Sequence, residues 1–340
     1  MNLEDLGEFG LIDRIRRSFA RRSSKAPIGI GDDAAALCVS PGNMLLATTD
    51  MLIEGIHFDL ATTDFYSLGW KSAAVNLSDI AAMGGRPRFC LVALAIPRRV
   101  TVEQIFAFYR GLGALLRKHA VLLVGGDTCS SKKDFVVTVV LLGESLKEQV
   151  LLRSGARQGD LIFVTGFLGD SAAGMELLNA ARRDKSAKGK KIHSKLVDKH
   201  LRPVPRVEWG QKLAATCVVT SMIDVSDGLS SDLGHICDES RVGAEIHVDR
   251  LPLSKAIRSA RELSRSPLEY ALSGGEDYEL LFTAPGNQER RVYTIMPGAT
   301  NIGTITKARG MKLLFPSGAV KPYTSSGYDH FRSRERSAPR

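Results

Sequence analysis

The chain contains 340 residues with a mass of 36.9 kDa, which is long enough for two domains with hydrophobic cores of their own. Its 44% hydrophobic and 24% charged residues exclude an intrinsically disordered, collagen-like or low-complexity protein. The longest apolar runs are much shorter than the roughly 18 residues that a membrane-spanning helix requires. The N-terminus carries acids where a secretory signal has basic and then apolar residues. We therefore expect a cytoplasmic protein with no membrane partner.

The formal net charge of +9 is concentrated in two segments. Residues 182–202 hold nine Lys or Arg against two Asp, and residues 332–340 hold four Arg against one Glu, so the rest of the chain is close to neutral. Such runs are most often solvated connectors or chain ends. We therefore do not expect nucleic acid as a partner, and a nucleic-acid-binding protein that uses these two segments is kept as an alternative.

Hydrophobic periodicity predicts α/β layers in two successive blocks. In the first block, strands are expected over 44–49, 89–96, 121–124 and 135–142, and helices over 65–82 and 102–118. In the second block, strands are expected over 161–165, 218–223, 243–248, 278–283 and 301–306, and helices over 170–182, 206–215 and 229–239. Thr101, followed three residues later by Gln104, is a capping-box signature for the helix that begins at residue 102.

The stretch near 143–153 is the best candidate for a domain boundary, because a polar segment separates the two blocks there. We therefore divide the chain into an N-terminal domain of residues 1–146, a C-terminal α/β domain of residues 147–330 and a basic, disordered tail of residues 331–340. The basic connector within 182–202 is expected to separate two helices of the second domain.

Acids that follow apolar strands are the clearest chemical signal. The segment LLATTD is an apolar strand that ends in Thr48, Thr49 and Asp50, all of which are hard oxygen ligands suited to Mg²⁺. Asp127 follows the apolar strand VLLVGG, at the carboxyl end where ligand crevices form in open α/β sheets. Turns at strand ends use the same residue types, so a purely structural turn is the alternative at both places.

Two further acidic positions occur on predicted helices. The segment WKSAAVNLSDIAAMGG reads as a mostly buried helix whose charges are Lys71 and Asp79, so the Asp79 carboxylate must be paired, coordinated or neutralised. We favour metal coordination over a capping role. In MIDVSDGLSSDLGHI a strand ends and a helix begins, which presents Asp224, Ser226 and Asp227 within one turn; a helix cap is the alternative for Asp227.

Glycine-containing turns supply the remaining candidates. In GIGDDAAAL two glycines precede Asp32 and Asp33, and a polar turn is the simpler interpretation of this motif alone. In LSGGEDYELLF, Glu276 and Asp277 precede an apolar strand and either line a substrate pocket or form a hairpin turn. The sequence contains no P-loop, dinucleotide-binding, zincin or nucleophile-elbow motif.

In this order the motifs resemble those of the thiamine-monophosphate kinases, in the superfamily that includes aminoimidazole ribonucleotide synthetase and selenophosphate synthetase. The resemblance covers nearly the whole chain and includes EFGLIDRI, GIGDDAA, TTDMLIEGIHF, KSAAVNLSDIAAMGG, GGDT, LRSGARQGD, TGFLGDSAAG, HLRPVPR, IDVSDGLSSDLGHI, SGGEDYELLFT and GYDHF. It implies a two-domain fold like that of aminoimidazole ribonucleotide synthetase, with ATP and Mg²⁺ bound by the N-terminal domain. It also implies a homodimer in which the N-terminal domains pair.

The resemblance further implies ATP-dependent phosphorylation of thiamine monophosphate to thiamine diphosphate, the final step of thiamine diphosphate biosynthesis, with several Mg²⁺ ions at the site. The implied Mg²⁺ ligands are Asp33, Thr48, Thr49, Asp50, Asp79, Asp127, Asp224 and Asp227. The implied ATP contacts are Gly126, Asp127, Arg153 and Ser226. The implied contacts to thiamine monophosphate are His57, Glu276 and Tyr328.

Phosphate chemistry accounts for these residue types. The acceptor is already an ionised phosphate oxygen, so no general base is expected among the side chains. Two phosphate groups repel each other strongly unless cations bridge them, and a ring of Asp oxygens that collects Mg²⁺ supplies those cations. Two alternatives stay open at this point. One is an ATP-dependent phosphotransferase of the same superfamily with another small acceptor, and the other is a metal-binding structural protein without catalysis.

Overall fold

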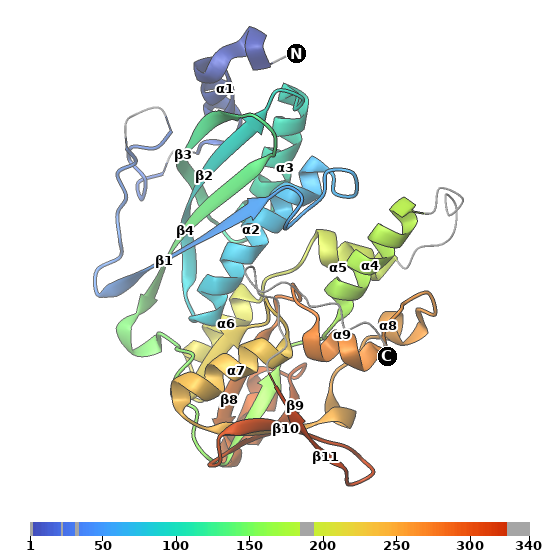
Figure 1. Cartoon of the computed structure of the whole chain (residues 1–340). Helices are drawn as coiled ribbons and strands as arrows, with labels where there is room; N and C mark the ends of the chain where they lie inside the picture. Colours follow the sequence, from blue (N-terminus) through green and yellow to red (C-terminus); the bar gives the residue numbers. More distant parts are fainter. Residues whose placement is uncertain (1–2, 22, 31–33, 184–193, 325–340) are drawn as a thin grey trace.

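The computed structural model describes residues 3–21, 23–30, 34–183 and 194–324 (Figure 1). Within these residues the strands form two sheets, which we call the N-terminal sheet, in the order β1-β4-β2-β3, and the C-terminal sheet, in the order β11-β10-β7-β9-β5-β8-β6. Each sheet is combined with helices, so the expected α/β layers in two blocks are confirmed. No described helix has the length and hydropathy needed to cross a membrane.

The N-terminal sheet is covered by helices on one face (Figure 1). Its elements are α1 (Leu3–Phe19), β1 (Asn43–Ile53), α2 (Phe65–Ala82), β2 (Arg86–Pro97), α3 (Val102–Lys118), β3 (Leu122–Ser131) and β4 (Val136–Leu146). Strand β4 runs antiparallel to both β1 and β2, whereas β2 and β3 are parallel. This order puts β1 and β3 at opposite edges of the N-terminal sheet.

The C-terminal sheet lies below the N-terminal sheet in the view of Figure 1, and several helices lie beside it. Its strands are β5 (Asp160–Val164), β6 (Ser221–Asp224), β7 (Gly243–His247), β8 (Leu280–Pro285), β9 (Thr300–Thr306), β10 (Gly310–Leu314) and β11 (Val320–Tyr323). Its helices are α4 (Asp170–Arg183), α5 (Ser194–Leu201), α6 (Val207–Ala214), α7 (Leu229–Ser240), α8 (Lys255–Ser259), α9 (Pro267–Ser273) and α10 (Glu289–Ile295). Short 3-10 turns occur at Lys147–Gln149, Val248–Arg250 and Gly286–Gln288.

Helix α2 is the central element because it packs against both sheets. It begins after Asp64, whose carboxylate accepts a hydrogen bond from the Ser67 amide at 2.9 Å. Its small residues let α3 approach closely: a Cβ on Gly69 would lie 1.9 Å from the Phe108 carbonyl oxygen. On its other side it contacts α5, α6 and β6. A residue on α2 can therefore reach the space between the two sheets.

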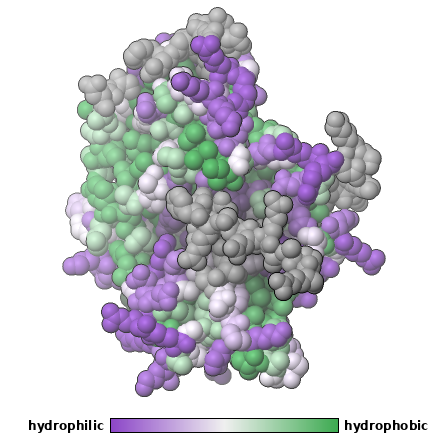
Figure 2. All heavy atoms as spheres, viewed as in Figure 1, coloured by the Kyte–Doolittle hydropathy of each residue, from purple (hydrophilic) through white to green (hydrophobic). Residues whose placement is uncertain are grey.

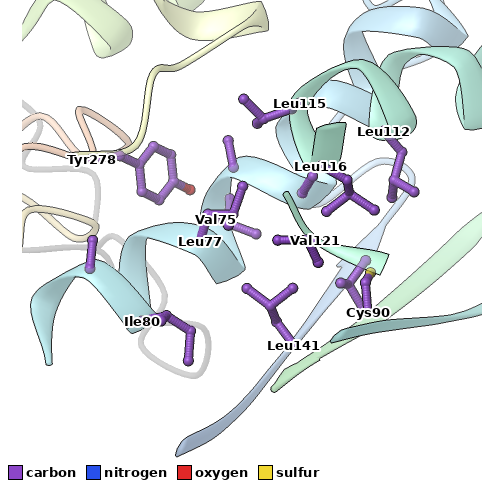
Figure 3. Close-up of a cluster of buried hydrophobic side chains, with 14 of the residues drawn as sticks. Val75, Leu77, Ile80, Cys90, Leu112, Leu115, Leu116, Val121, Leu141 and Tyr278 are labelled. Carbon is purple, nitrogen blue, oxygen red and sulfur yellow. The ribbon is translucent and has the colours of Figure 1, made fainter. Parts of the chain in front are cut away.

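One hydrophobic cluster is continuous from the N-terminal sheet to the C-terminal sheet. It contains α2 and α3 residues such as Leu77 and Leu112 together with Phe163 of β5 and Phe282 of β8. Figure 3 shows Tyr278 on one side of α2, opposite the residues of the N-terminal sheet. Each fully buried side chain of this size contributes about 1.5–3 kcal/mol to folding. The two sheets are therefore held together by core packing.

The sequence predicted α2 and α3 to within one residue, and the capping box at α3 is confirmed. The Thr101 hydroxyl accepts from the Gln104 amide at 3.3 Å, and the Gln104 side chain accepts from the Thr101 amide at 2.9 Å. The sequence missed α1, α8, α9, α10, β10 and β11. It also missed α5, since residues 194–201 lie in the predicted basic connector; only Leu196 and His200 are buried in this Lys-rich helix.

Two predicted strands extend past the polar residues that were expected to end them. Strand β1 continues to Ile53, and β3 continues to Ser131. The interpretation of Thr48, Thr49, Asp50 and Asp127 as residues at strand ends is therefore wrong, because all four lie within ladders of backbone hydrogen bonds. Their polar side chains look like turn signals in the sequence.

Candidate active site

A cavity of about 500 Å³, which we call the interdomain cavity, lies between the N-terminal sheet and the helices and loops of the C-terminal sheet. Eight of the predicted site residues line this cavity, namely Thr49, Asp50, His57, Asp79, Asp224, Ser226, Asp227 and Glu276. A neighbouring cavity of about 430 Å³ is also lined by Asp79 and Asp224, and adds Thr48 and Arg153. Residues that are far apart in the sequence, and that were weak signals singly, thus meet at one place.

Three elements deliver the acids that we call the acid cluster, namely Asp50, Asp79 and Asp224. Asp50 comes from β1, where it lies on the same face of the strand as the buried Leu52 and alternates with the exposed Thr49 and Met51. Asp79 comes from the last turns of α2, and its carboxylate accepts a hydrogen bond from the Thr48 hydroxyl. Asp224 is the last residue of β6, one residue beyond the predicted strand, and accepts from the Ser78 hydroxyl at 2.6 Å.

The acids of this cluster repel one another. Burial, and then the charge of Asp79, raise the pKa of Asp50 to about 7. Burial, followed by the charge of Asp79, likewise raises the pKa of Asp224 to about 7. Burial also raises the pKa of Asp79, although the Thr48 hydroxyl and the positive charge of Arg153 act in the opposite direction. The positive charge of Arg153 does not offset burial and the mutual repulsion of the acids, so a further cation that enters the cluster is stabilised.

The acid cluster fits Mg²⁺ in its chemistry. Mg²⁺ prefers oxygen ligands, and it usually keeps several waters while binding one or two carboxylates together with substrate phosphates. Among the described residues, no group of three or more His, Cys, Asp or Glu is arranged to hold a metal ion. The fit therefore rests on the type of ligand and on the mutual repulsion of the acids, with the remaining ligands to come from water and substrate.

The turn between β6 and α7 is organised by an acid that the sequence analysis missed. The buried carboxylate of Asp232 accepts from the amides of Ser226, Asp227 and Gly228 at 3.1, 3.2 and 3.1 Å. Gly228 is the N-cap of α7 and has no side chain to act as a cap. Gly228 therefore holds the N-cap position that the alternative gave to Asp227. A signal was present in the sequence, because Asp232 is an acid in the first turn of a predicted helix.

Glu276 lies on the C-terminal wall of the interdomain cavity, where the alternative of a simple hairpin turn does not hold. Its carboxylate lies 2.7 Å from Lys71 Nζ and 3.2 Å from His200 Nδ1. Burial alone would raise the pKa of Glu276, but Lys71 and His200 outweigh it and hold the pKa well below its usual range. Lys71 and His200 were not predicted as site residues.

The interdomain cavity also has an apolar lining. Met51, Ile56 and Met175 line it next to His57, and each of the three is exposed. The Nδ1 atom of His57 accepts a hydrogen bond from the Ile53 amide at 3.0 Å, which fixes the orientation of the ring. The cavity therefore combines an apolar region with the acidic region formed by the acid cluster.

Gly126 and Asp127, two of the predicted site residues, do not line the interdomain cavity. They line a separate cavity of about 440 Å³ with Tyr109 and apolar side chains of α1, such as Ile12 and Ile15. A Cβ on Gly126 would lie 1.9 Å from the Val92 carbonyl oxygen, so β3 requires glycine there. This cavity is at the β3 edge of the N-terminal sheet, whereas Asp50 is at the β1 edge. A single chain therefore does not bring Asp127 to the acid cluster.

Two predicted site residues, Asp33 and Tyr328, lie outside the described residues, as does the predicted tail of residues 331–340. Tyr109 is a lining residue that the sequence analysis missed. It lies on α3 with the spacing of a core residue and is 3% exposed, so nothing in the sequence distinguished it from its buried neighbours.

Comparisons with known proteins cover both halves of the chain. The family model described as "AIR synthase related protein, N-terminal domain" matches residues 31–145, and the corresponding C-terminal domain model matches residues 157–315. The thiamine-monophosphate kinase of Salmonella typhimurium is 40% identical over 333 residues, which cover 96% of this chain and 98% of that protein. Relatives from Aquifex aeolicus and Bacillus subtilis are each 37% identical over similar lengths.

Two solved structures have the same fold. The crystal structure of thiamine-monophosphate kinase from Stenotrophomonas maltophilia superimposes with a TM-score of 0.79 at 38% identity, covering 91% of this chain and 96% of that one. The structure of AaThiL complexed with AMPPCP and TMP superimposes with a TM-score of 0.77 at 35% identity, covering 97% and 99%. The chain therefore belongs to the thiamine-monophosphate kinases, a family of enzymes with the two AIR synthase-related domains.

Proposed function

We propose that this protein transfers the γ-phosphate of ATP directly to thiamine monophosphate in the cytoplasm, as the final step of thiamine diphosphate biosynthesis. The observation that carries the proposal is the interdomain cavity, which combines the acid cluster with an ionised Glu276 and an apolar lining. The similarity to a structure that holds AMPPCP and TMP supports the same two substrates here. No general base is needed, because the attacking oxygen already belongs to a phosphate.

In this proposal the metal ligands are Asp33, Thr48, Thr49, Asp50, Asp79, Asp127, Asp224 and Asp227. When bound, Mg²⁺ neutralises the phosphate oxygens of donor and acceptor and aligns them for in-line transfer. The chain's own residues do the positioning. Arg153 and Ser226 bind the phosphates of ATP, while His57, Glu276 and Tyr328 hold the thiamine part of the acceptor, next to the apolar Met51 and Ile56.

We also propose that the enzyme is a homodimer in which the N-terminal domains, residues 1–146, pair. The face of the N-terminal sheet away from α2 and α3 exposes Leu45 and Met51, which are 50% and 54% accessible. Figure 2 shows hydrophobic residues gathered on the left of the upper half of the molecule, where Figure 1 places this sheet. An exposed apolar face of this kind is typical of a subunit interface.

Pairing also offers a way to complete the site. If β3 of one copy lies beside β1 of its partner, Asp127 and Gly126 approach the acid cluster of the other subunit. A complementation experiment tests this: inactive Asp79→Asn and Asp127→Asn variants are mixed under conditions that exchange subunits. Shared sites predict that activity returns in the mixed dimer, whereas sites built from one chain predict that it does not.

The activity itself is tested by product analysis of the purified protein with ATP, Mg²⁺ and thiamine monophosphate. We expect thiamine diphosphate from the monophosphate, no diphosphate from free thiamine, and no product with EDTA. If folded protein that binds ATP yields no diphosphate, the acceptor is another small phosphorylated molecule, and the proposal is wrong. Metal-dependent stability without any ADP formation would instead favour a structural metal-binding protein.

A further inference from the structure

We propose that Lys71 and His200 are positioning residues of the acceptor site, which hold the Glu276 carboxylate in one orientation toward the interdomain cavity. There Glu276 accepts a hydrogen bond from the thiamine part of the acceptor. The inference rests on the proposed function, in which Glu276 contacts thiamine monophosphate. It adds two residues that do not themselves line the cavity.

Two helices contact the Glu276 carboxylate, one at each oxygen. Lys71 belongs to α2, its side chain is only 2% exposed, and its Nζ atom lies 2.7 Å from Glu276 Oε1. His200 belongs to α5, is also buried, and its Nδ1 atom lies 3.2 Å from Glu276 Oε2. Each oxygen thus has its own cationic or polar partner, approached from a different element. Two such contacts fix the plane of the carboxylate, which one contact would leave free to rotate.

The backbone of Glu276 is held as well. Its φ angle is 65°, a left-handed conformation that non-glycine residues adopt only when the surrounding structure imposes it. The amide of Glu276 donates to the Ser226 carbonyl oxygen at 2.7 Å, and the amide of Tyr278 donates to the Val225 carbonyl oxygen at 2.8 Å. The segment is therefore tied to the turn after β6, which carries the predicted ATP contact.

The charges leave Glu276 with a defined chemical role. Lys71 and His200 keep it ionised, so the group is a hydrogen-bond acceptor and not a donor. Its side chain remains 29% exposed, and it lines the cavity. The ligand must therefore offer a donor or a positive charge, and thiamine offers both in its amino-substituted ring and its cationic ring. Beyond the ion pair, Lys71 Nζ has no hydrogen-bond partner among the described residues, so it acts through Glu276.

A nearby pair supplies the matched control. Glu279 lies three residues further along and is fully buried, and it is bound by Lys199 at 2.8 Å and by Arg206 at 2.6 Å through both carboxylate oxygens. Neither Glu279 nor Lys199 lines the interdomain cavity. Lys199 thus makes the same kind of ion pair on the same segment, without access to the acceptor.

The test compares Lys71→Met with Lys199→Met in steady-state kinetics with purified dimer and varied thiamine monophosphate or ATP. We expect Lys71→Met to raise KM for thiamine monophosphate by about ten-fold or more, because a freed carboxylate no longer presents its oxygen to the ligand. The KM for ATP should stay within about three-fold. Lys199→Met should lower the melting temperature while both KM values remain within about two-fold of wild type.

A double-mutant cycle with Glu276→Gln shows whether Lys71 acts through Glu276. In the Glu276→Gln background, Lys71→Met should change KM for thiamine monophosphate by less than about two-fold, since the interaction is already lost. An unchanged full effect in that background would overturn the inference. If Lys71→Met does not fold, the double variant Lys71→Met/Glu276→Gln, which lacks both charges, is compared with Glu276→Gln alone. Equal KM values for thiamine monophosphate support the inference, and different values overturn it.

The proposed function and the positioning role of Lys71 and His200 can be refuted separately. If the wild-type enzyme makes no thiamine diphosphate, the proposed function is wrong and this inference falls with it. If the wild type is active but Lys71→Met leaves KM for thiamine monophosphate unchanged, only the positioning role is wrong. His200→Asn keeps a side-chain donor and should retain a lower KM than His200→Ala, whereas equal values would remove His200 from the role.

Discussion

Two groups of acidic side chains in this protein differ in what neutralises them. In the acid cluster, Asp50 and Asp224 face Asp79, and burial together with mutual repulsion raises the pKa of both to about 7. At the start of β8, Glu276 and Glu279 face lysine, histidine and arginine side chains, which hold both pKa values below the usual range despite burial. The cationic side chains beside Glu276 and Glu279 outweigh the effect of burial, whereas Arg153 beside the acid cluster does not.

The difference separates two kinds of role. An acid with a protein cation is fixed and satisfied, and it can orient a neighbour or a ligand. An acid with only other acids for neighbours is unsatisfied until a cation arrives from solution. On this view the acid cluster is a place for Mg²⁺ and phosphate, whereas the paired acids determine geometry. The following experiments test that distinction, beginning with the largest expected effect.

Asp79→Asn should reduce kcat on the order of 10²- to 10³-fold, because one carboxylate that holds cations against the phosphates is lost. The same direction is expected for Asp50→Asn and Asp127→Asn. Folding should be retained, since the change also removes repulsion within the cluster. Kinetics and thermal unfolding of each variant check this, and full activity in all three would refute the assignment of metal ligands.

Glu279→Gln should have the opposite profile, with a large loss of stability. Removing one partner leaves Lys199 and Arg206 without their shared buried carboxylate, which costs about 3–5 kcal/mol of unfolding free energy. Urea denaturation measures the change. A loss below about 1 kcal/mol would show that Glu279 is not the satisfied structural acid that its contacts indicate.

The pH dependence of the metal-free protein is the third test. The folded-state pKa values of Asp50 and Asp224, about 7, lie above the ordinary value of 3.8, so the folded protein binds these protons more tightly than the unfolded chain. Their stabilising contribution is present at about pH 4 and is lost as the pH rises through about 7. We expect a decrease of roughly 1–3 kcal/mol over this interval.

Thermal unfolding in EDTA between pH 5 and pH 8 measures that decrease. Adding Mg²⁺ should restore stability, and more so at pH 8 than at pH 5, because the metal competes with protons for the same carboxylates. The Asp50→Asn and Asp224→Asn variants serve as controls whose profiles should be flatter. A Mg²⁺ effect that is equal at both pH values would argue against binding at the acid cluster.

The smallest effect is expected for an ion pair on the surface of α5. Asp198 and Arg202 are four residues apart, and both side chains are about half exposed, so solvent screens their attraction. Asp198→Asn should change the unfolding free energy by less than about 0.5 kcal/mol and leave the kinetics as in wild type. A larger change would mean that α5 is more sensitive to charge than burial and contacts indicate.

The sequence was most informative where local signals determine structure. Helices α2 and α3 were predicted to within one residue, because their apolar spacing and cap residues are local features. The extents of β1 and β3 could not be read from the sequence, since Thr49 and Asp127 resemble turn residues but sit within strands. Helix α5 was not predicted, because only a narrow side of it is buried.

For the site residues as well, local features of the sequence could be read and long-range contacts could not. The acids were visible as residues next to apolar segments, and their order along the chain indicated the family. Lys71, His200 and Asp232 could not be assigned, because each acquires its role from a partner elsewhere in the chain or from backbone amides. The roles given to all the site residues stay predictions, and Asp33 and Tyr328 also lie outside the described residues.

The hydrophobic cluster that joins the two sheets has a consequence for how this enzyme unfolds. Because Leu77 of α2 and Phe282 of β8 belong to the same cluster, unfolding of either half exposes apolar side chains of the other half in that cluster. The family models divide the chain between residues 145 and 157, but we expect the two parts to unfold as one cooperative unit. Calorimetry should therefore record a single heat-absorption peak, and either half expressed alone should behave as a collapsed, unstable chain.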